Sequence, residues 1–112
     1  MPILRSDRLN EAPPGCPLTG FGIARMKKGV DPGLELHFHD GDEFWFLVEG
    51  RVRVLSEGEE YVLHPGEALY TPAGQDHTIL EVVEDAVVVW MEGELKGRRR
   101  PGHLHRPHDP WP

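Results

Sequence analysis

Glycine and proline interrupt this chain so often that long helices have no room to form. The 112 residues include 13 Gly and 11 Pro. Turn-forming pairs such as Glu49-Gly50, Pro65-Gly66 and Ala73-Gly74 recur at intervals of about 8–12 residues, which is typical of the short strands of an all-β sandwich or barrel. No segment sustains a helical period of 3.6 residues. The sequence therefore predicts an all-β fold.

The segments between these turns have the composition of strands. Residues 51–54 alternate Arg and Val, as expected for a half-buried strand. Residues 44–48, Phe-Trp-Phe-Leu-Val, are apolar on both faces, so both faces need cover, from the N-terminal segment or from a second subunit. Strands are predicted over residues 21–26, 34–38, 44–48, 51–54, 61–63, 68–70, 77–83 and 86–91.

The length suits a single domain. We divide the chain into a lead-in segment (1–17), a barrel (18–95) and a basic Pro/His-rich tail (96–112). The single Cys excludes an internal disulfide and a Cys-based zinc site. Because there is no apolar run of about 18 residues and no signal-peptide pattern, we expect no membrane span and a cytoplasmic location.

The formal net charge of −7 is distributed unevenly. Residues 1–95 hold 7 basic and 18 acidic residues, a net −11, whereas residues 96–112 hold five basic residues and one acidic, a net +4. An acidic body disfavours nucleic acid as a partner. The tail carries His103, His105 and His108, for which we expect an adventitious metal site, because proline-rich chain preorganises ligands poorly. Alternatively, His105 or Trp111 folds over the mouth of the barrel.

The residues that point most directly to chemistry are His37, His39 and Glu43. Residues two apart in a strand point to the same face, so the two imidazoles project side by side. The neighbouring residues are apolar, and burying two imidazoles and a carboxylate without partners is costly. A bound metal such as Mn, Fe, Co, Ni, Cu or Zn removes that cost. His77, after a later turn, is a fourth candidate ligand.

Together these positions resemble the two motifs of the cupins, a family of small β-barrels. The first motif, G-x5-H-x-H-x3,4-E-x6-G, corresponds to Asp31-x5-His37-x-His39-x3-Glu43-x6-Gly50. The second, G-x5-P-x-G-x2-H-x3-N, corresponds to Gly66-x5-Pro72-x-Gly74-x2-His77-x3-Glu81. Residues 51–65 separate them. Asp31 and Glu81 depart from the pattern, but neither position is a metal ligand in the family.

The resemblance implies a double-stranded β-helix, or jelly-roll, barrel. It also implies one divalent transition metal per chain (Mn, Fe, Ni, Cu, Co or Zn), held by His37, His39, Glu43 and His77. Two coordination positions would stay open for water or a small-molecule ligand. A homodimer is expected as well, since cupins commonly pair through sheet packing or strand exchange.

Several other side chains are candidates for the pocket. Trp45 and Leu47 share the face of Glu43 by strand parity, so they either line the cavity or pack in the core. Tyr70 is either a hydrogen-bond donor in the cavity or a half-buried strand residue. Glu81 shares the parity of His77, so it either points toward the cavity as an acid–base group beside Glu43 or lies in solvent at a strand end. Arg25, Arg51 and Arg53 either bind an anionic substrate or belong to solvated strand faces.

A cupin fold alone does not define a function. We favour an oxygenase-type enzyme, in which a small substrate chelates the metal and O2 reacts beside it. A sugar or keto-acid isomerase, in which Glu43 or Glu81 moves the proton, is the first alternative. The second is a non-catalytic domain that binds a small ligand or senses the metal itself.

Overall fold

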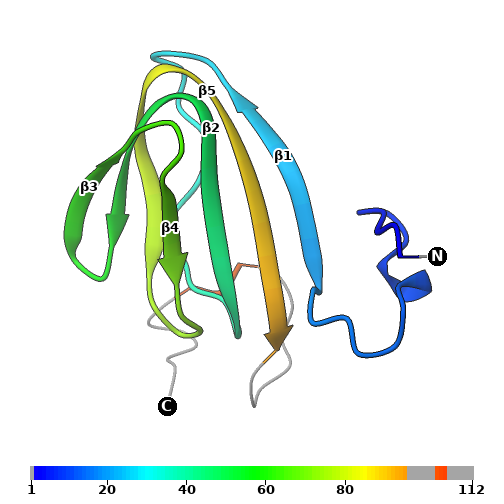
Figure 1. Ribbon diagram of the computed structural model, residues 1–112. Coiled ribbons are helices and arrows are strands. Elements are labelled where there is room, and N and C mark those ends of the chain that lie inside the picture. Colours follow the sequence, from blue (N-terminus) through cyan, green and yellow to red (C-terminus); the bar gives the residue numbers. More distant parts are fainter. Residues whose placement is uncertain (1, 96–102, 106–112) are drawn as a thin grey trace.

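The computed structural model describes residues 2–95 and 103–105 (Figure 1). Neighbouring strands are antiparallel in the order β1-β5-β2-β3, and β4 also pairs with β2. The all-β prediction is confirmed. The elements are the 3-10 helix η1 (Leu9–Glu11) and the strands β1 (Gly20–Met26), β2 (Gly41–Ser56), β3 (Glu59–Leu63), β4 (Ala68–Thr71) and β5 (His77–Leu95).

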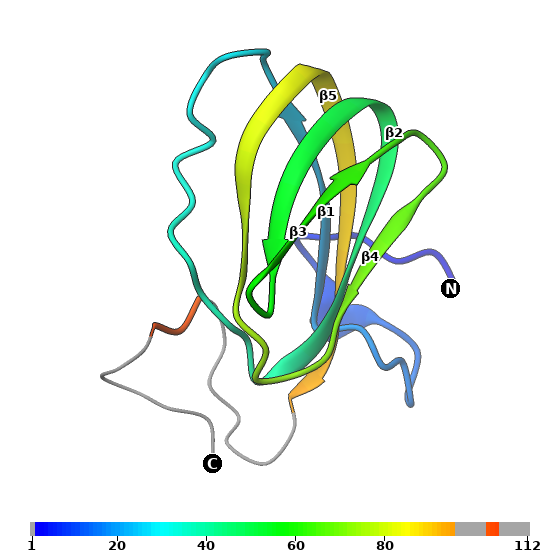
Figure 2. The same ribbon diagram turned by 90° about the vertical axis from the view of Figure 1, so that its left-hand side faces the viewer.

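Two long strands give the molecule its shape. β2 and β5 pair from Gly41 opposite Leu95 to Ser56 opposite His77. Both bend sharply at the top of Figure 1, and Figure 2 shows that their two halves then lie in two facing layers. One layer adds β1 and β4 to the sheet, and the other adds β3. This curled antiparallel sheet is the jelly-roll arrangement predicted from the sequence.

Because β2 and β5 bend without ending, two of our predicted strand boundaries were wrong. The segments 44–48 and 51–54, predicted as two strands, form the single strand β2, and 77–83 and 86–91 likewise form β5. Glu49-Gly50 does not reverse the chain. Instead the β2–β5 register shifts on both sides of Glu49, and Gly50 has a φ of +85°. A bulge that contains such a glycine bends a strand without ending it.

Residues 34–38, predicted as a strand, lie outside the five strands. Their ladder contacts are two isolated bridges, His37 with His77 and Phe38 with Leu104. Consecutive residues therefore pair with segments on opposite sides, so no continuous ladder forms. Within the described residues, no helix is both long and apolar enough to span a membrane.

The space between the two layers holds the hydrophobic core. Along the first half of β2 the burial alternates, with Glu43, Trp45 and Leu47 buried and Phe44 and Phe46 exposed. This alternation places the carboxylate and the core residues on the inner face, as period-two parity predicts. The core consists of Trp45, Leu47, Val52, Val54, Leu63, Ile79, Val82, Ala86 and Val88.

Candidate metal centre

The four predicted metal ligands meet in one buried cluster. His37 and His39 precede β2, Glu43 lies in β2, and His77 begins β5. One ligand atom from each residue lies within 4.8 Å of the others, and all four residues are at most 4% exposed. The bridge between His37 and His77 joins the two segments through backbone hydrogen bonds of 3.2 and 2.7 Å. The sheet thus assembles the cluster from distant parts of the chain.

The outer nitrogen of each imidazole is already engaged. In His37 and in His77, Nδ1 donates to the carbonyl oxygen of the residue two positions earlier, at 2.6 and 3.2 Å. In His39, Nδ1 lies 3.3 Å from the Glu92 carboxylate. Such outer partners fix the ring orientation of metal-binding histidines and leave Nε2 to face the metal. All three rings therefore direct Nε2 toward the centre of the cluster.

The inner atoms fit a cation. His77 Nε2 lies 2.8 Å and His39 Nε2 3.4 Å from Oε1 of Glu43. The buried Nε2 of His37 has no hydrogen-bond partner among residues 2–95 and 103–105. Burial, and to a smaller extent the nearby imidazoles, lowers the pKa of His37 to about 3, so its ring is neutral and has a lone pair to donate. Three nitrogens and one carboxylate match the donor preferences of divalent transition metals.

The carboxyl group within the cluster and a second one beside it differ in their protonation behaviour. Burial alone would raise the pKa of Glu43, but hydrogen bonds with His39 and His77 hold it well below its usual value. Burial raises the pKa of Glu92 to about 6. Glu43 and Glu92 are direct partners in the β2–β5 register, which brings both carboxylates to the same side. Glu43 is thus the charged carboxylate of the cluster, and the pKa of Glu92 is raised toward neutral pH.

Sequence reasoning missed Glu92. Our predicted strand ended at residue 91, one residue before it, whereas β5 continues to Leu95. The sequence did contain a signal for Glu92. Val88, Trp90 and Glu92 are at alternate positions, so in one continuous strand their side chains share a face.

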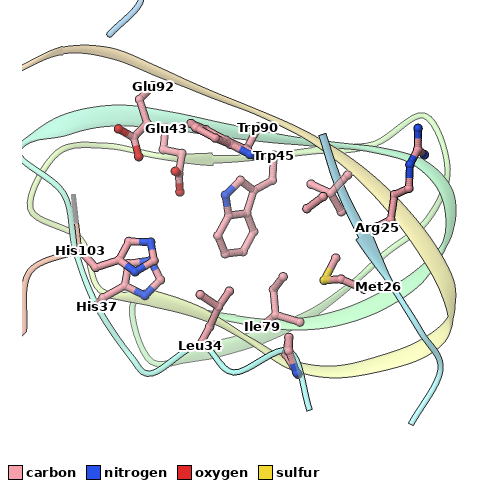
Figure 3. Close-up of a pocket in the computed structure, with 13 residues that line it drawn as sticks. Arg25, Met26, Leu34, His37, Glu43, Trp45, Ile79, Trp90, Glu92 and His103 are labelled. Carbon is pink, nitrogen blue, oxygen red and sulfur yellow. The ribbon is translucent and has the colours of Figure 1, made fainter. Parts of the chain in front are cut away.

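The cluster opens on a cavity of about 460 Å³. Figure 3 shows its two unlike ends: His37, His103, Glu43 and Glu92 lie at one end, and Met26 and Ile79 lie toward the other, which Arg25 also borders. The Trp45 indole lies between them, and its ring centroid is 4.9 Å from that of His77. The remaining lining residues are Ala24, Pro32, Leu34, Val88 and Trp90.

Only some of the predicted pocket residues line the cavity. Trp45 lies in the cavity wall, whereas Leu47 is fully buried in the core and does not line the cavity. Tyr70 is 52% exposed and stacks on Phe44 at a centroid distance of 5.0 Å. Because it is the register partner of an outward-facing residue, it points away from the cavity and cannot donate into it.

Of the two placements considered for Glu81, the structure shows the one in solvent, not the one in the cavity. Glu81 is exposed, and its carboxylate is 3.3 Å from Nε of Arg53 on the outer surface. The register shifts here, from Arg53 opposite Glu81 to Val54 opposite Ile79, which leaves Leu80 as an extra residue. The alternation that starts at His77 is therefore out of phase beyond this bulge, and Glu81 is not placed to act as an acid–base group at the cluster.

The predicted anion-binding arginines do not gather at the cluster. Arg53 also pairs with Glu60 at 3.0 Å, and Arg51 pairs with Glu84 on the surface. These pairs fit the interpretation as solvated strand faces. Arg25 borders the cavity at the end far from Glu43 and His37 (Figure 3).

Part of the tail reaches the cluster. The His103 ring stacks on that of His37, with centroids 4.0 Å apart and an interplanar angle of 26°. Partial burial lowers the pKa of His103. His105 is exposed, and its Nδ1 donates to the carbonyl oxygen of Leu36 at 3.0 Å. His108 and Trp111, two other tail candidates, lie outside the described residues.

Comparison with known proteins places this fold in a family. The Cupin domain family matches residues 22–93. The uncharacterized protein y4oW of Sinorhizobium fredii is 34% identical over 83 residues, which are 70% of this chain and 38% of that protein. The chain thus spans well under half the length of that relative.

Solved structures show the same fold. A predicted oxalate decarboxylase from Thermotoga maritima has a TM-score of 0.66 at 17% identity, covering 83% of this chain and 76% of its own. The DMSP lyase DddQ from Ruegeria pomeroyi has a TM-score of 0.65 at 20% identity, covering 80% of this chain and 43% of its own. With the family match and the curled sheet that unites the two motifs, this chain belongs to the cupin family.

Proposed function

We propose that this cupin is a metal-dependent enzyme that acts on a small organic molecule, with oxygenase-type chemistry. The observation that carries the proposal is the buried His37–His39–Glu43–His77 cluster at one end of a cavity of about 460 Å³. Four protein ligands leave two positions of a six-coordinate ion for exogenous groups. The cofactor would be one divalent transition metal per chain, from among Mn, Fe, Ni, Cu, Co and Zn.

The cavity favours a substrate with two unlike ends. An oxygen-bearing head group suits the end lined by His37, Glu43 and Glu92. A compact apolar body suits the rest of the cavity, where the Trp45 indole offers a flat wall opposite Leu34 and Ile79. These walls hold the body in place by excluding water, so the head group is oriented by the shape of the cavity.

When bound, a redox-active metal would polarise the oxygens of the head group and allow reaction with O2 beside them. The chain's own residues supply the rest. Glu92 orients His39 through the contact of 3.3 Å, and the apolar wall protects a reactive product from hydrolysis.

Oxygen consumption tests this proposal. Metal-free protein, purified without a His-tag, is loaded separately with Fe(II), Mn(II), Cu(II) and Zn(II), then offered diketones, thiols and catechols with apolar substituents. We expect oxygen uptake with at least one redox-active metal and none with zinc. Absence of uptake with every redox-active metal, or full turnover with zinc, would contradict oxygenase chemistry.

Glu92 favours isomerisation as the second candidate function. Its pKa of about 6 suits a group that accepts and returns a proton near neutral pH, and it borders the cavity beside the ligand Glu43. Turnover of a sugar or keto acid by the zinc form, lost in Glu92→Gln with zinc still bound, would support this alternative.

We also propose that the cupin forms a homodimer through the outer face of the layer that contains β1 and β4. The strand register aligns apolar side chains in two rows across the four strands of this face. Several of these side chains are exposed: Phe44 and Phe46 by 39% each and Ile23 by 60%. The N-terminal segment lies beyond β1 and does not cross β2 or β4 (Figure 1), so that described segment leaves this face open, and we propose a second copy as its cover. The rows are Tyr70-Phe44-Met91-Phe21 and Ala68-Phe46-Val89-Ile23.

Phe46→Glu is expected to convert this dimer to a monomer, because it places a carboxylate in the centre of the apolar face. Analytical ultracentrifugation at several protein concentrations measures the change. Val62→Glu is the matched control, since Val62 is 44% exposed on β3 in the other layer. A monomeric native protein, or dissociation by both substitutions alike, would contradict the proposed interface.

A further inference from the structure

We propose that residues 103–105 form a strap that holds the His103 imidazole at the open side of the metal centre, where it hydrogen-bonds to a molecule bound there. This inference rests on the metal centre proposed above. It gives a role to residues that lie outside both cupin motifs.

The strap is fastened to the segment that carries two of the ligands. The backbone amide of Phe38 donates to the carbonyl oxygen of Leu104 at 2.8 Å, and the amide of Leu104 donates back to Phe38 at 2.9 Å. Phe38 is fully buried and lies between the ligands His37 and His39 in sequence. His105 adds its hydrogen bond to the carbonyl oxygen of Leu36. Attachment of the strap therefore fixes where His103 enters the site.

His103 differs from the four ligands in its position. Its ring is 4.0 Å from that of His37 and nearly parallel to it, and 5.2 Å from that of His39 at an angle of 74°. It is exposed, whereas the four ligands are buried, and it is not among the residues whose ligand atoms lie within 4.8 Å of one another. Figure 3 shows both stacked rings at the polar end of the cavity. His103 thus lies one ring spacing from a ligand, at the edge of the space left for a bound molecule.

An imidazole at this place has a definite use. At the polar end of the cavity, the acidic neighbours Glu43 and Glu92 are acceptors when ionised, and an anionic head group would need a donor. The N–H of His103 supplies one from outside the ligand cluster. We therefore assign it a positioning role toward the exogenous molecule and no role as a fifth ligand.

Azide binding to the Co(II)-loaded protein tests the assignment, because azide occupies an open metal position and its binding is visible in the absorption spectrum. We expect His103→Ala to weaken azide binding about tenfold, as for one lost hydrogen bond to a charged group, with Co(II) affinity unchanged within about threefold. His103→Gln should restore most of the azide affinity. Leu104→Pro, which removes the amide that donates to Phe38, should reproduce the loss while His103 is intact.

The matched control is His64→Ala, since His64 is an exposed histidine whose ring contacts Glu67 in the turn between β3 and β4. Equal azide affinity in His103→Ala and the native protein would overturn the proposal. A large loss of Co(II) affinity in His103→Ala would make it a ligand and overturn the proposal too. If the native protein itself fails to bind Co(II), the metal centre is wrong and the proposed function fails with it.

Discussion

His77→Ala is expected to lower the affinity for Co(II) or Zn(II) by more than about 100-fold. Loss of an outer partner of a metal ligand typically lowers affinity by about 10–100-fold, and loss of the ligand itself should exceed that. His77 also has its Nε2 2.8 Å from the Glu43 carboxylate, so the substitution disturbs a second ligand. Competition with a chelating dye measures the affinity, and elemental analysis after dialysis measures the metal retained.

The fold must be shown to survive this substitution, because His77 is completely buried and its backbone bridges to His37. Circular dichroism and the thermal melting of the metal-free protein provide that test. His64→Ala, remote from the cluster, should retain the metal affinity of the native protein. If folded His77→Ala still holds one metal ion per chain after dialysis, the proposed metal centre is wrong.

The candidate ligand cluster was predictable because it depends on short spacings. His37 and His39 share a face by parity, and the two motifs specify the remaining positions without reference to the rest of the fold. The groups around the ligands were not predictable in this way. Glu92 reaches His39 only because β5 pairs in one register with β2, and His103 stacks on His37 only because Leu104 pairs with Phe38. Alternation with Trp90 could have shown which face Glu92 lies on, but no local pattern in the sequence shows which distant segments meet.

The fold was predictable in class and less so in its boundaries. Alternating apolar residues and regular turns predicted most of the strands, although residues 34–38 lie outside them. Strand ends were harder to predict, because a bulge and a turn use the same kinds of residue. Glu49-Gly50 therefore indicated the end of a strand where β2 only bends. The extra residue at Leu80 likewise breaks the parity that had made Glu81 a candidate for the cavity. Parity holds within an unbroken ladder and fails across each bulge.

Gly50→Ala is expected to destabilise the protein by about 3 kcal/mol or more, combining overpacking with a positive φ that alanine rarely adopts. A Cβ at this position would lie 2.1 Å from the carbonyl oxygen of Asp85 and 2.7 Å from Cα of Ala86. Both are backbone atoms of β5, so no side-chain rotation relieves the overlap. Urea denaturation of the metal-free protein measures the loss.

Gly58→Ala separates the two causes, because Gly58 has a φ of +81° but nothing within 4 Å of the added Cβ. The free energy of unfolding of Gly58→Ala should therefore fall by only about 1 kcal/mol, from backbone strain alone. Equal losses in the two variants would mean that β2 and β5 do not approach closely at Gly50. The bend would then not depend on this glycine. The two layers would face each other, and His77 would reach Glu43, without it. If Gly50→Ala loses more stability than Gly58→Ala and also binds metal more weakly, the metal centre depends on the bend.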